Sequence, residues 1–267
     1  MTAIAQDRAG VVEAADRLRD AARTGVPASP VRDLIGSEDI ASAYAVQRLL
    51  VSERIADGAT RVGRKIGLTS PAVQSQFGVS QPDFGVLFDD MSYVGGDTIQ
   101  ISTILQPRVE AEIAFALSAD LAEGDLDLEQ IRAAVDYAVA ALEVCGSRIR
   151  NWDITFGDTV ADNASAGAYV LGPRRRRLDE IEPRKAEMSM TIDGKVVSTG
   201  NGAACMGDPL IALQWLARQA RDLGDPLKAG EIVLSGALGA MQPVDPGSTV
   251  SASISGIGKV KVTFSEE

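Results

Sequence analysis

Three glutamates form the pattern with the most chemical content. Residues 106–117 read QPRVEAEIAFAL, in which Arg108, Glu110 and Glu112 alternate with apolar residues. A period of two predicts a β-strand with these charges on one face, where like charges repel unless something positive lies between them. Glu143 lies in a second apolar run, YAVAALEVCGSRI. We hypothesise that the three glutamates meet around one hard divalent cation. The alternative is that they are solvated on an exposed strand face.

The absence of histidine limits the chemistry further. Ser-His-Asp and Cys-His catalysis, histidine bases and histidine-ligated zinc are excluded. Proton transfer must use Asp, Glu, Lys, Tyr, Cys or water, and a metal held by oxygens would be Mg²⁺, Mn²⁺ or Ca²⁺. The two cysteines, Cys145 and Cys205, form no close sequence pair and predict neither a disulfide framework nor a zinc site.

Composition indicates an ordinary globular protein. The chain has 267 residues, 45% hydrophobic and 24% charged, with a net charge of −11. That charge argues against nucleic-acid binding. No apolar run reaches the length of a bilayer span, and the N-terminal residues lack a basic start and an apolar core. We therefore expect no membrane association and a cytoplasmic location.

The N-terminal region is predicted to be helical. Residues 8–24 and 38–57 show helical periodicity, and Ser37 is expected to cap the second helix. We expect 1–60 to form a mainly helical layer against a β-rich core of 61–267, within one domain spanning 1–267. A mostly antiparallel, strongly curved core gives an α+β fold class.

Two further polar residues lie beside predicted strands. RVGRKIGL is typical of a short strand, with Lys65 between two glycines. Thr69 or Ser70 should then cap a short helix, with Pro71 near its first turn. Asp83 lies in the turn of QPDFGVLF. By pattern alone, Lys65 is typical of a surface lysine and Asp83 of a turn former, and neither residue would be singled out.

Later segments carry other signals. The polar stretch between the Glu143 run and the strand GAYVLG suits a loop that lines a site, or a plain surface loop. The four arginines at 174–177, beside several acids, indicate a solvated loop. A hairpin is predicted at Asp193–Gly194.

The order of several motifs resembles the 2-keto-4-pentenoate (2-hydroxypentadienoate) hydratase family, within the fumarylacetoacetate-hydrolase-like superfamily. These motifs are GRKIGLT, QPDFGVLF, LQPRVEAEIAF, ALEVCGSRI, DTVADNASAG and LSGALGAM. Each is weak alone, but the six in order with similar spacing are strong, and the resemblance runs from about Arg32 to Phe264. The resemblance implies a mixed curved β-roll with N-terminal and inserted helices, an Mg²⁺ or Mn²⁺ ion and a homo-oligomer that associates with other enzymes of its pathway.

The resemblance also implies a site. Glu110, Glu112 and Glu143 would be the metal ligands, and Lys65, Asp83 and Ser165 the catalytic residues. The implied reaction is hydration of 2-hydroxypenta-2,4-dienoate, a small 2-oxo or 2-hydroxydienoate substrate, to 4-hydroxy-2-oxopentanoate in meta-cleavage degradation of aromatic compounds. Whether Lys65 acts as a charged donor or as a base is left open.

Three other functions stay open. A 4-oxalocrotonate (2-oxo-3-hexenedioate) decarboxylase would use the same metal but need a positive group for a second carboxylate, and sequence does not place Arg148 or Arg150 there. Hydrolysis of an acylpyruvate C–C bond would ordinarily call for a better-placed water activator. A non-catalytic partner subunit of such an enzyme is opposed by the presence of every expected site residue.

Overall fold

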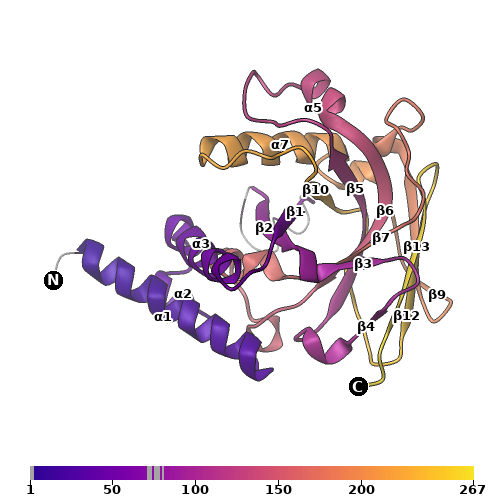
Figure 1. Cartoon of the computed structure of the whole chain (residues 1–267). Helices are drawn as coiled ribbons and strands as arrows, with labels where there is room; N and C mark the ends of the chain where they lie inside the picture. The colour runs from indigo at the N-terminus through magenta and orange to yellow at the C-terminus, as the bar shows by residue number, and fades with distance from the viewer. Residues whose placement is uncertain (1–2, 71–73, 75–78, 80) are drawn as a thin grey trace.

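The computed structural model describes residues 3–70, 74, 79 and 81–267. The short helix predicted around Pro71 lies outside these residues. Three helices come first: α1 (Ala3–Thr24), α2 (Arg32–Ile35) and α3 (Ile40–Ala56). Figure 1 shows α1 reaching beyond the body of the molecule. None of the helices in the described part of the chain combines the length and apolarity that crossing a bilayer requires.

The N-terminal helices pack on α6 (Phe156–Ala161) through a shared apolar cluster. Leu18 of α1, Val46 of α3 and Val160 of α6 are among its buried members. The cap of α3 differs from the prediction: the Asp39 carboxylate, not Ser37, accepts a hydrogen bond from Ser42 N at 3.0 Å. Both residue types favour this position, and the helix begins at the later one.

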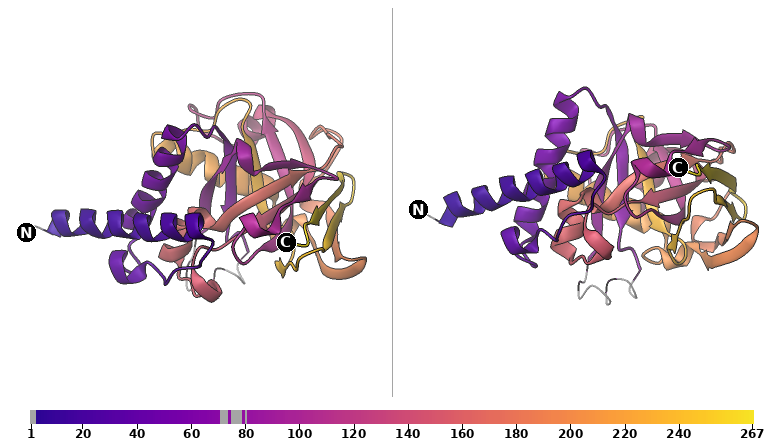
Figure 2. Two further views of the ribbon diagram at one scale, coloured as in Figure 1. Left: turned by 60° about the horizontal axis from the view of Figure 1, so that its bottom comes forward. Right: turned by 90° about the horizontal axis from the view of Figure 1, so that it is seen from below.

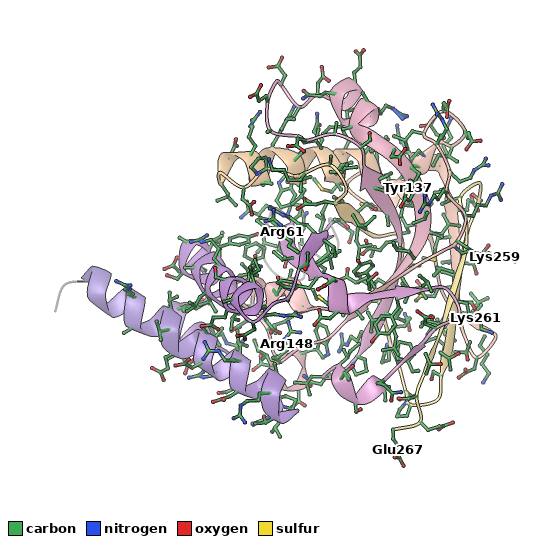
Figure 3. All side chains as sticks on the ribbon, in the orientation of Figure 1. Arg61, Tyr137, Arg148, Lys259, Lys261 and Glu267 are labelled. Carbon is green, nitrogen blue, oxygen red and sulfur yellow. The ribbon has the colours of Figure 1, made fainter. Side chains whose placement is uncertain are left out.

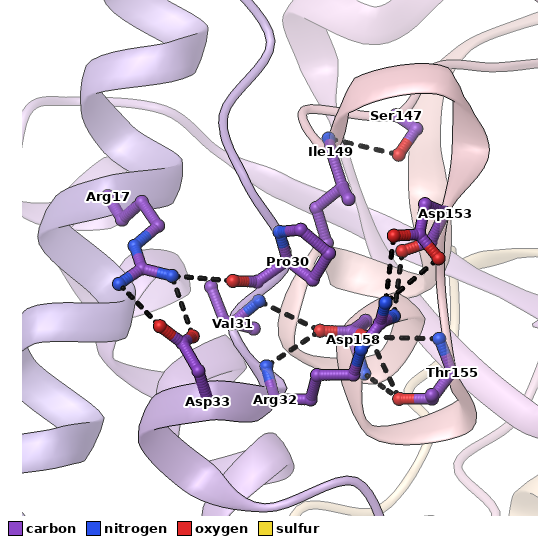
Figure 4. Close-up of polar contacts among 10 residues, drawn as sticks. All are labelled: Arg17, Pro30, Val31, Arg32, Asp33, Ser147, Ile149, Asp153, Thr155 and Asp158. Atoms are coloured by element: carbon purple, nitrogen blue, oxygen red, sulfur yellow. Dashed lines mark hydrogen bonds and ion pairs between the residues drawn. The ribbon is translucent and has the colours of Figure 1, made fainter.

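A buried carboxylate fixes α2 to α6 (Figure 4). Asp158 is fully buried, and its Oδ1 accepts hydrogen bonds from the backbone N–H groups of Val31 and Arg32 at 2.8 and 2.9 Å. Its Oδ2 accepts from the Arg32 guanidinium at 2.9 Å and from the Thr155 hydroxyl at 2.8 Å. One side chain thus joins the N-terminal layer to the segment that leads to Ser165.

The larger sheet holds the predicted glutamate strands. Its order is β2-β1-β10-β5-β6-β7-β3, with β11 paired to β5. Neighbours are mostly antiparallel, but β1 pairs with β10, and β3 with β7, in parallel. The strands are β1 (Arg61–Gly67), β2 (Asp83–Phe88), β3 (Ser92–Val94), β5 (Arg108–Leu117), β6 (Val135–Cys145), β7 (Ala166–Leu171), β10 (Ile232–Ala237) and β11 (Gln242–Pro243).

A second sheet lies at the far end of the molecule from the N-terminal helices (Figures 1 and 2). Its order is β4-β13-β12-β8-β9. The strands are β4 (Thr98–Ile99), β8 (Glu187–Ile192), β9 (Lys195–Asn201), β12 (Thr249–Ile254) and β13 (Gly258–Phe264). Asp193 and Gly194 join β8 to β9 with φ of 50° and 78°, which confirms the predicted hairpin.

The main apolar core lies between the two sheets and extends under α5 (Leu128–Ala134) and α7 (Pro209–Asp222). Val109, Ala111 and Ile113 of β5 point into this core. Because strand side chains alternate, Arg108, Glu110 and Glu112 point to the opposite face. The predicted α+β class and curved mixed β core are confirmed.

The arginine run is largely exposed, as predicted. The Arg175 guanidinium lies 4.4 Å from the ring centre of Tyr137, which Figure 3 labels, and Arg177 pairs with Asp179 at 3.3 Å. These contacts leave the run at the protein surface, away from the glutamates.

Candidate active site

Glu110 and Glu143 are directly opposite each other on neighbouring strands. The antiparallel register pairs Glu110 of β5 with Glu143 of β6, and Glu112 with Ala141. Side chains at paired positions come within about 5 Å of each other, so two carboxylates here repel unless a cation lies between them. The register therefore brings together residues that are 33 positions apart in the chain.

Burial makes this repulsion more costly. Glu112 is 0% exposed and Glu143 only 1%. Burial, followed by the charge of Glu143, raises the pKa of Glu110 to about 7. The same two causes raise the pKa of Glu112 well above its usual value. The cluster is electrostatically unfavourable as a set of bare carboxylates.

Several of these oxygens lack a hydrogen-bond donor in the described part of the chain. Gly236 N donates to Glu112 Oε2 at 2.7 Å, but Glu112 Oε1 accepts nothing. Glu143 Oε1 forms a 2.9 Å ion pair with Lys65 Nζ, yet neither Glu143 oxygen accepts a hydrogen bond of normal geometry. Buried acceptors without donors are rare in folded proteins. These oxygens fit a hard divalent cation, which prefers oxygen ligands.

Lys65 lies inside the cluster. Its side chain is 4% exposed, and Nζ also donates to the Ala164 carbonyl at 2.9 Å. Burial favours the neutral amine, but the charge of Glu143 and other neighbouring acids outweighs it and raises the pKa of Lys65. Lys65 is thus a buried ammonium with two fixed contacts, not the surface lysine that pattern alone allowed.

Asp83 begins β2, opposite Gly67 at the end of β1. A Cβ atom at Gly67 would overlap Asp83 Oδ1 and come within 3.4 Å of Lys65 Nζ. Because Gly67 has no side chain, Asp83 and Lys65 have room to approach each other. Burial raises the pKa of Asp83 to about 6, although the charge of Lys65 opposes this. Asp83 Oδ1 has no hydrogen-bond donor among the residues described.

Ser165 ends a short left-handed turn, η4 (Asn163–Ser165), just before β7. Asn163, Ala164 and Ser165 have φ of 54°, 50° and 56°. The Ser165 hydroxyl is buried, 3.3 Å from Thr159 Oγ1. The turn reaches Lys65 through the carbonyl of Ala164, the residue that precedes Ser165, whereas the Ser165 hydroxyl itself contacts Thr159.

Sequence reasoning missed Cys145 as a neighbour of the glutamates. Oxygens of Glu110 and Glu143 and Cys145 Sγ lie within 4.8 Å of one another. Glu112 shares the face but is not in that group. Burial raises the pKa of the Cys145 thiol. Its position two residues after Glu143, on the same strand face, was the available signal.

A surface hollow of about 250 Å³ lies elsewhere, lined by Arg54, Tyr93 and Arg148 among others. None of the six predicted residues lines it. The cluster of predicted residues therefore lies apart from this hollow.

The sequence model for the fumarylacetoacetate (FAA) hydrolase C-terminal region matches residues 62–265. The chain belongs to the fumarylacetoacetate hydrolase family. Among curated members, it is 50% identical over 260 residues to the TodF product hydratase of Pseudomonas putida, covering 97% of each chain. It is 48% identical over 260 residues to the 2-keto-4-pentenoate hydratase of Burkholderia vietnamiensis, covering 97% of this chain and 99% of that one.

A solved family member has a closely similar fold. The 4-oxalocrotonate decarboxylase of Pseudomonas putida G7, complexed with magnesium and adipate, matches with a TM-score of 0.92 and 33% identity. The match covers 96% of this chain and 98% of that one. The similarity therefore includes the N-terminal helices that precede the matched family region.

Proposed function

We propose that this protein is a metal-dependent hydro-lyase that converts 2-hydroxypenta-2,4-dienoate to 4-hydroxy-2-oxopentanoate in meta-cleavage degradation of aromatic compounds. The observation that carries the choice of reaction is the similarity to relatives named as hydratases, 48% and 50% identical over 97% of this chain. The buried carboxylates beside Lys65 support a site for a divalent cation, whose positive charge a small anionic substrate would need in this acidic protein.

The proposed metal ligands are Glu110, Glu112 and Glu143, with Mg²⁺ or Mn²⁺ as the ion. Buried oxygens of Glu112 and Glu143 that lack donors support this assignment, as does the magnesium named in the related decarboxylase structure. Cys145 stays outside the proposed set because hard cations prefer oxygen. When bound, the ion supplies positive charge that stabilises negative charge on the substrate's 2-oxygen.

Lys65 and Asp83 are proposed to handle the protons. Lys65 acts as the charged donor, because its ion pair with Glu143 and its bond to Ala164 hold an ammonium in place. Asp83, whose Oδ1 has no donor among the described residues, relays a proton from the 2-hydroxyl to C5, which gives 2-oxopent-3-enoate. Water then adds its oxygen to C4 and a proton goes to C3. Ser165 orients the substrate and this water.

The direct test is the ultraviolet absorbance of the dienoate mixed with protein and Mg²⁺ or Mn²⁺. Loss of conjugation, with 4-hydroxy-2-oxopentanoate identified by NMR, is the expected result. Glu110→Gln, Glu143→Gln and Lys65→Ala should each lower the rate by about 100-fold or more. Wild-type kcat in Lys65→Ala, or glutamate variants within a few-fold of wild type, would remove those residues from the proposed roles.

Decarboxylation of 2-oxo-3-hexenedioate is the second candidate, because the decarboxylase of known structure is 33% identical. Its substrate carries a second carboxylate. Arg148 is committed elsewhere: its guanidinium donates to the Asp162 carboxylate, the Asp162 carbonyl and the Ala166 carbonyl. Arg150 is exposed and contacts the Pro27 carbonyl at 3.5 Å. Release of CO₂ from 2-oxo-3-hexenedioate faster than hydration of the dienoate would select the decarboxylase.

We also propose that the chain acts in the cytoplasm as a single domain and a homo-oligomer, associated with other enzymes of its pathway. The contact of α1–α3 with α6 supports one domain. Light scattering after gel filtration tests the oligomer, and copurification with pathway enzymes tests the association. A protein that turns over no member of a panel of dienoates, 2-oxo-3-enoates and acylpyruvates would instead be a non-catalytic partner.

A further inference from the structure

The left-handed turn of η4 is fixed to the edge of the large sheet by one amide side chain. Asn163 Oδ1 accepts from Val86 N at 2.8 Å, and Asn163 Nδ2 donates to the Val86 carbonyl at 2.9 Å. Val86 lies in β2, at the end of the sheet order. The amide therefore replaces a neighbouring strand at this residue and pairs both backbone groups.

The same turn approaches β2 so closely that only glycine fits beneath it. A Cβ atom at Gly85 would clash with the Asn163 carbonyl oxygen. Gly85 is paired with Lys65 across β2 and β1. The turn thus lies directly over the strand positions that carry Lys65.

The left-handed conformation of this turn requires contacts that stabilise it. Three successive non-glycine residues have positive φ, which is strained for Ala164 and Ser165 and better tolerated by Asn163. Arg148 holds both ends, since its guanidinium donates to the Asp162 and Ala166 carbonyls. Asn163 fixes the middle to β2. Between these anchors the Ala164 carbonyl points at Lys65 Nζ.

From this geometry we propose that Asn163 is a positioning residue for the reaction suggested above. Its amide holds the left-handed turn against β2, and the turn in turn orients the Lys65 ammonium through the Ala164 carbonyl and presents the Ser165 hydroxyl. Asn163 makes no contact with the glutamates in the described structure, so its loss should affect turnover far more than metal binding. This proposal rests on the proposed hydratase activity for its kinetic test only.

The kinetic test compares Asn163→Gly with Asn151→Gly. Glycine keeps the positive φ and removes only the side chain. Asn151 is a matched control because it also has positive φ, at 60°, but is exposed. We expect Asn163→Gly to lower kcat by about 10- to 100-fold, with KM and the Mn²⁺ dissociation constant within about threefold of wild type. Asn151→Gly should match wild type.

Gly85→Ala provides a second route, because it pushes the turn away without altering Asn163. It should show the same loss of kcat with little change in Mn²⁺ affinity. The proposal is overturned if both variants keep kcat within about threefold of wild type. It is equally overturned if Mn²⁺ affinity falls in parallel with kcat, or if Asn151→Gly loses as much activity as Asn163→Gly.

A readout without substrate separates this proposal from the hydratase assignment. Lys65 is the one buried residue among the six lysines of the chain, all of which the structure describes. Its ¹⁵N-labelled ammonium should give a slowly exchanging NMR signal that disappears in Lys65→Arg. Asn163→Gly should broaden or shift that signal, whereas Asn151→Gly should not. An unchanged signal overturns the proposal, and a changed signal in a protein without hydratase turnover overturns only the proposed function.

Discussion

Lys65 Nζ lies 2.9 Å from Glu143 Oε1, and the two side chains are only 4% and 1% exposed. Neither partner can regain water if the other is removed, so the pair must be considered as a unit. Glu112 differs, because its contact in the described structure is the backbone N–H of Gly236. The same substitution at Glu143 and at Glu112 should therefore have different effects on stability.

Glu143→Gln should lower the free energy of unfolding by about 3 kcal/mol in the presence of a chelator, because it leaves the Lys65 charge buried and unpaired. Glu112→Gln should stay within about 1 kcal/mol of wild type, since burial and the neighbouring carboxylates already raise the pKa of Glu112 and favour its neutral form. Urea unfolding of both variants measures this. Equal losses of unfolding free energy in the two variants would show that the Lys65–Glu143 pair contributes no more to stability than Glu112 does.

Metal should stabilise the folded protein. With Mn²⁺ at 100 times its dissociation constant, the free energy of unfolding should rise by about 2.7 kcal/mol. If Glu112 is a ligand, the same Mn²⁺ concentration should leave the free energy of unfolding of Glu112→Gln nearly unchanged. Thermal melts with and without EDTA measure the effect. A variant stabilised as strongly as wild type would remove Glu112 from the proposed ligand set.

Asp225 should make stability depend on acid pH. Its carboxylate lies 2.7 Å from the buried Arg64 guanidinium and 2.6 Å from that of Arg61. Burial raises the pKa of Asp225, but the two arginines outweigh burial and lower it overall. A lowered folded pKa gives stability that is present above the unfolded value of about 4 and is lost as pH falls through the folded value.

Asp225→Asn should therefore destabilise the protein at pH 7, by about 2 kcal/mol after allowance for the half-exposed carboxylate. It should also flatten the loss of stability below about pH 4. Asp179→Asn, which breaks an exposed pair with Arg177, is the control and should change stability by less than about 0.5 kcal/mol. Parallel pH curves for wild type and Asp225→Asn would contradict the assignment.

Asp158→Ala should loosen the N-terminal layer. The substitution leaves the N–H groups of Val31 and Arg32 without their acceptor and should cost about 3 kcal/mol. Hydrogen exchange should accelerate in α2 more than in the large sheet. Asp153→Ala removes an exposed partner of the same arginine and should cost less than about 1 kcal/mol. Uniform acceleration across the chain would argue against a local anchor.

The strand carrying Glu110 and Glu112 could be predicted from sequence because alternation of charge and apolarity reports strand faces directly. The pairing of Glu110 with Glu143 could not, because the register depends on how two distant strands meet. Lys65 and Asp83 have no periodic signature, and family resemblance selected them. Only the fold shows that Lys65 is buried and paired.

The cap of α3 and the role of Asn163 could not be predicted from the local sequence pattern. Ser37 and Asp39 are both good caps, and choosing between them needs the point at which α3 begins. Asn163 lies in the polar stretch before the strand GAYVLG, and nothing in that stretch distinguishes it. Its importance arises from a positive φ and from contact with Val86, 77 positions earlier in the chain. Neither property can be read from neighbouring residues.

The amide of Asn163 also has a consequence for solubility. Val86 lies in an edge strand, and unpaired backbone groups on such an edge offer a template for a strand from another molecule. Because Asn163 already occupies both the N–H and the C=O of Val86, that residue is closed to intermolecular β-sheet growth. The side chain proposed to order Lys65 thus also closes this position of the sheet edge.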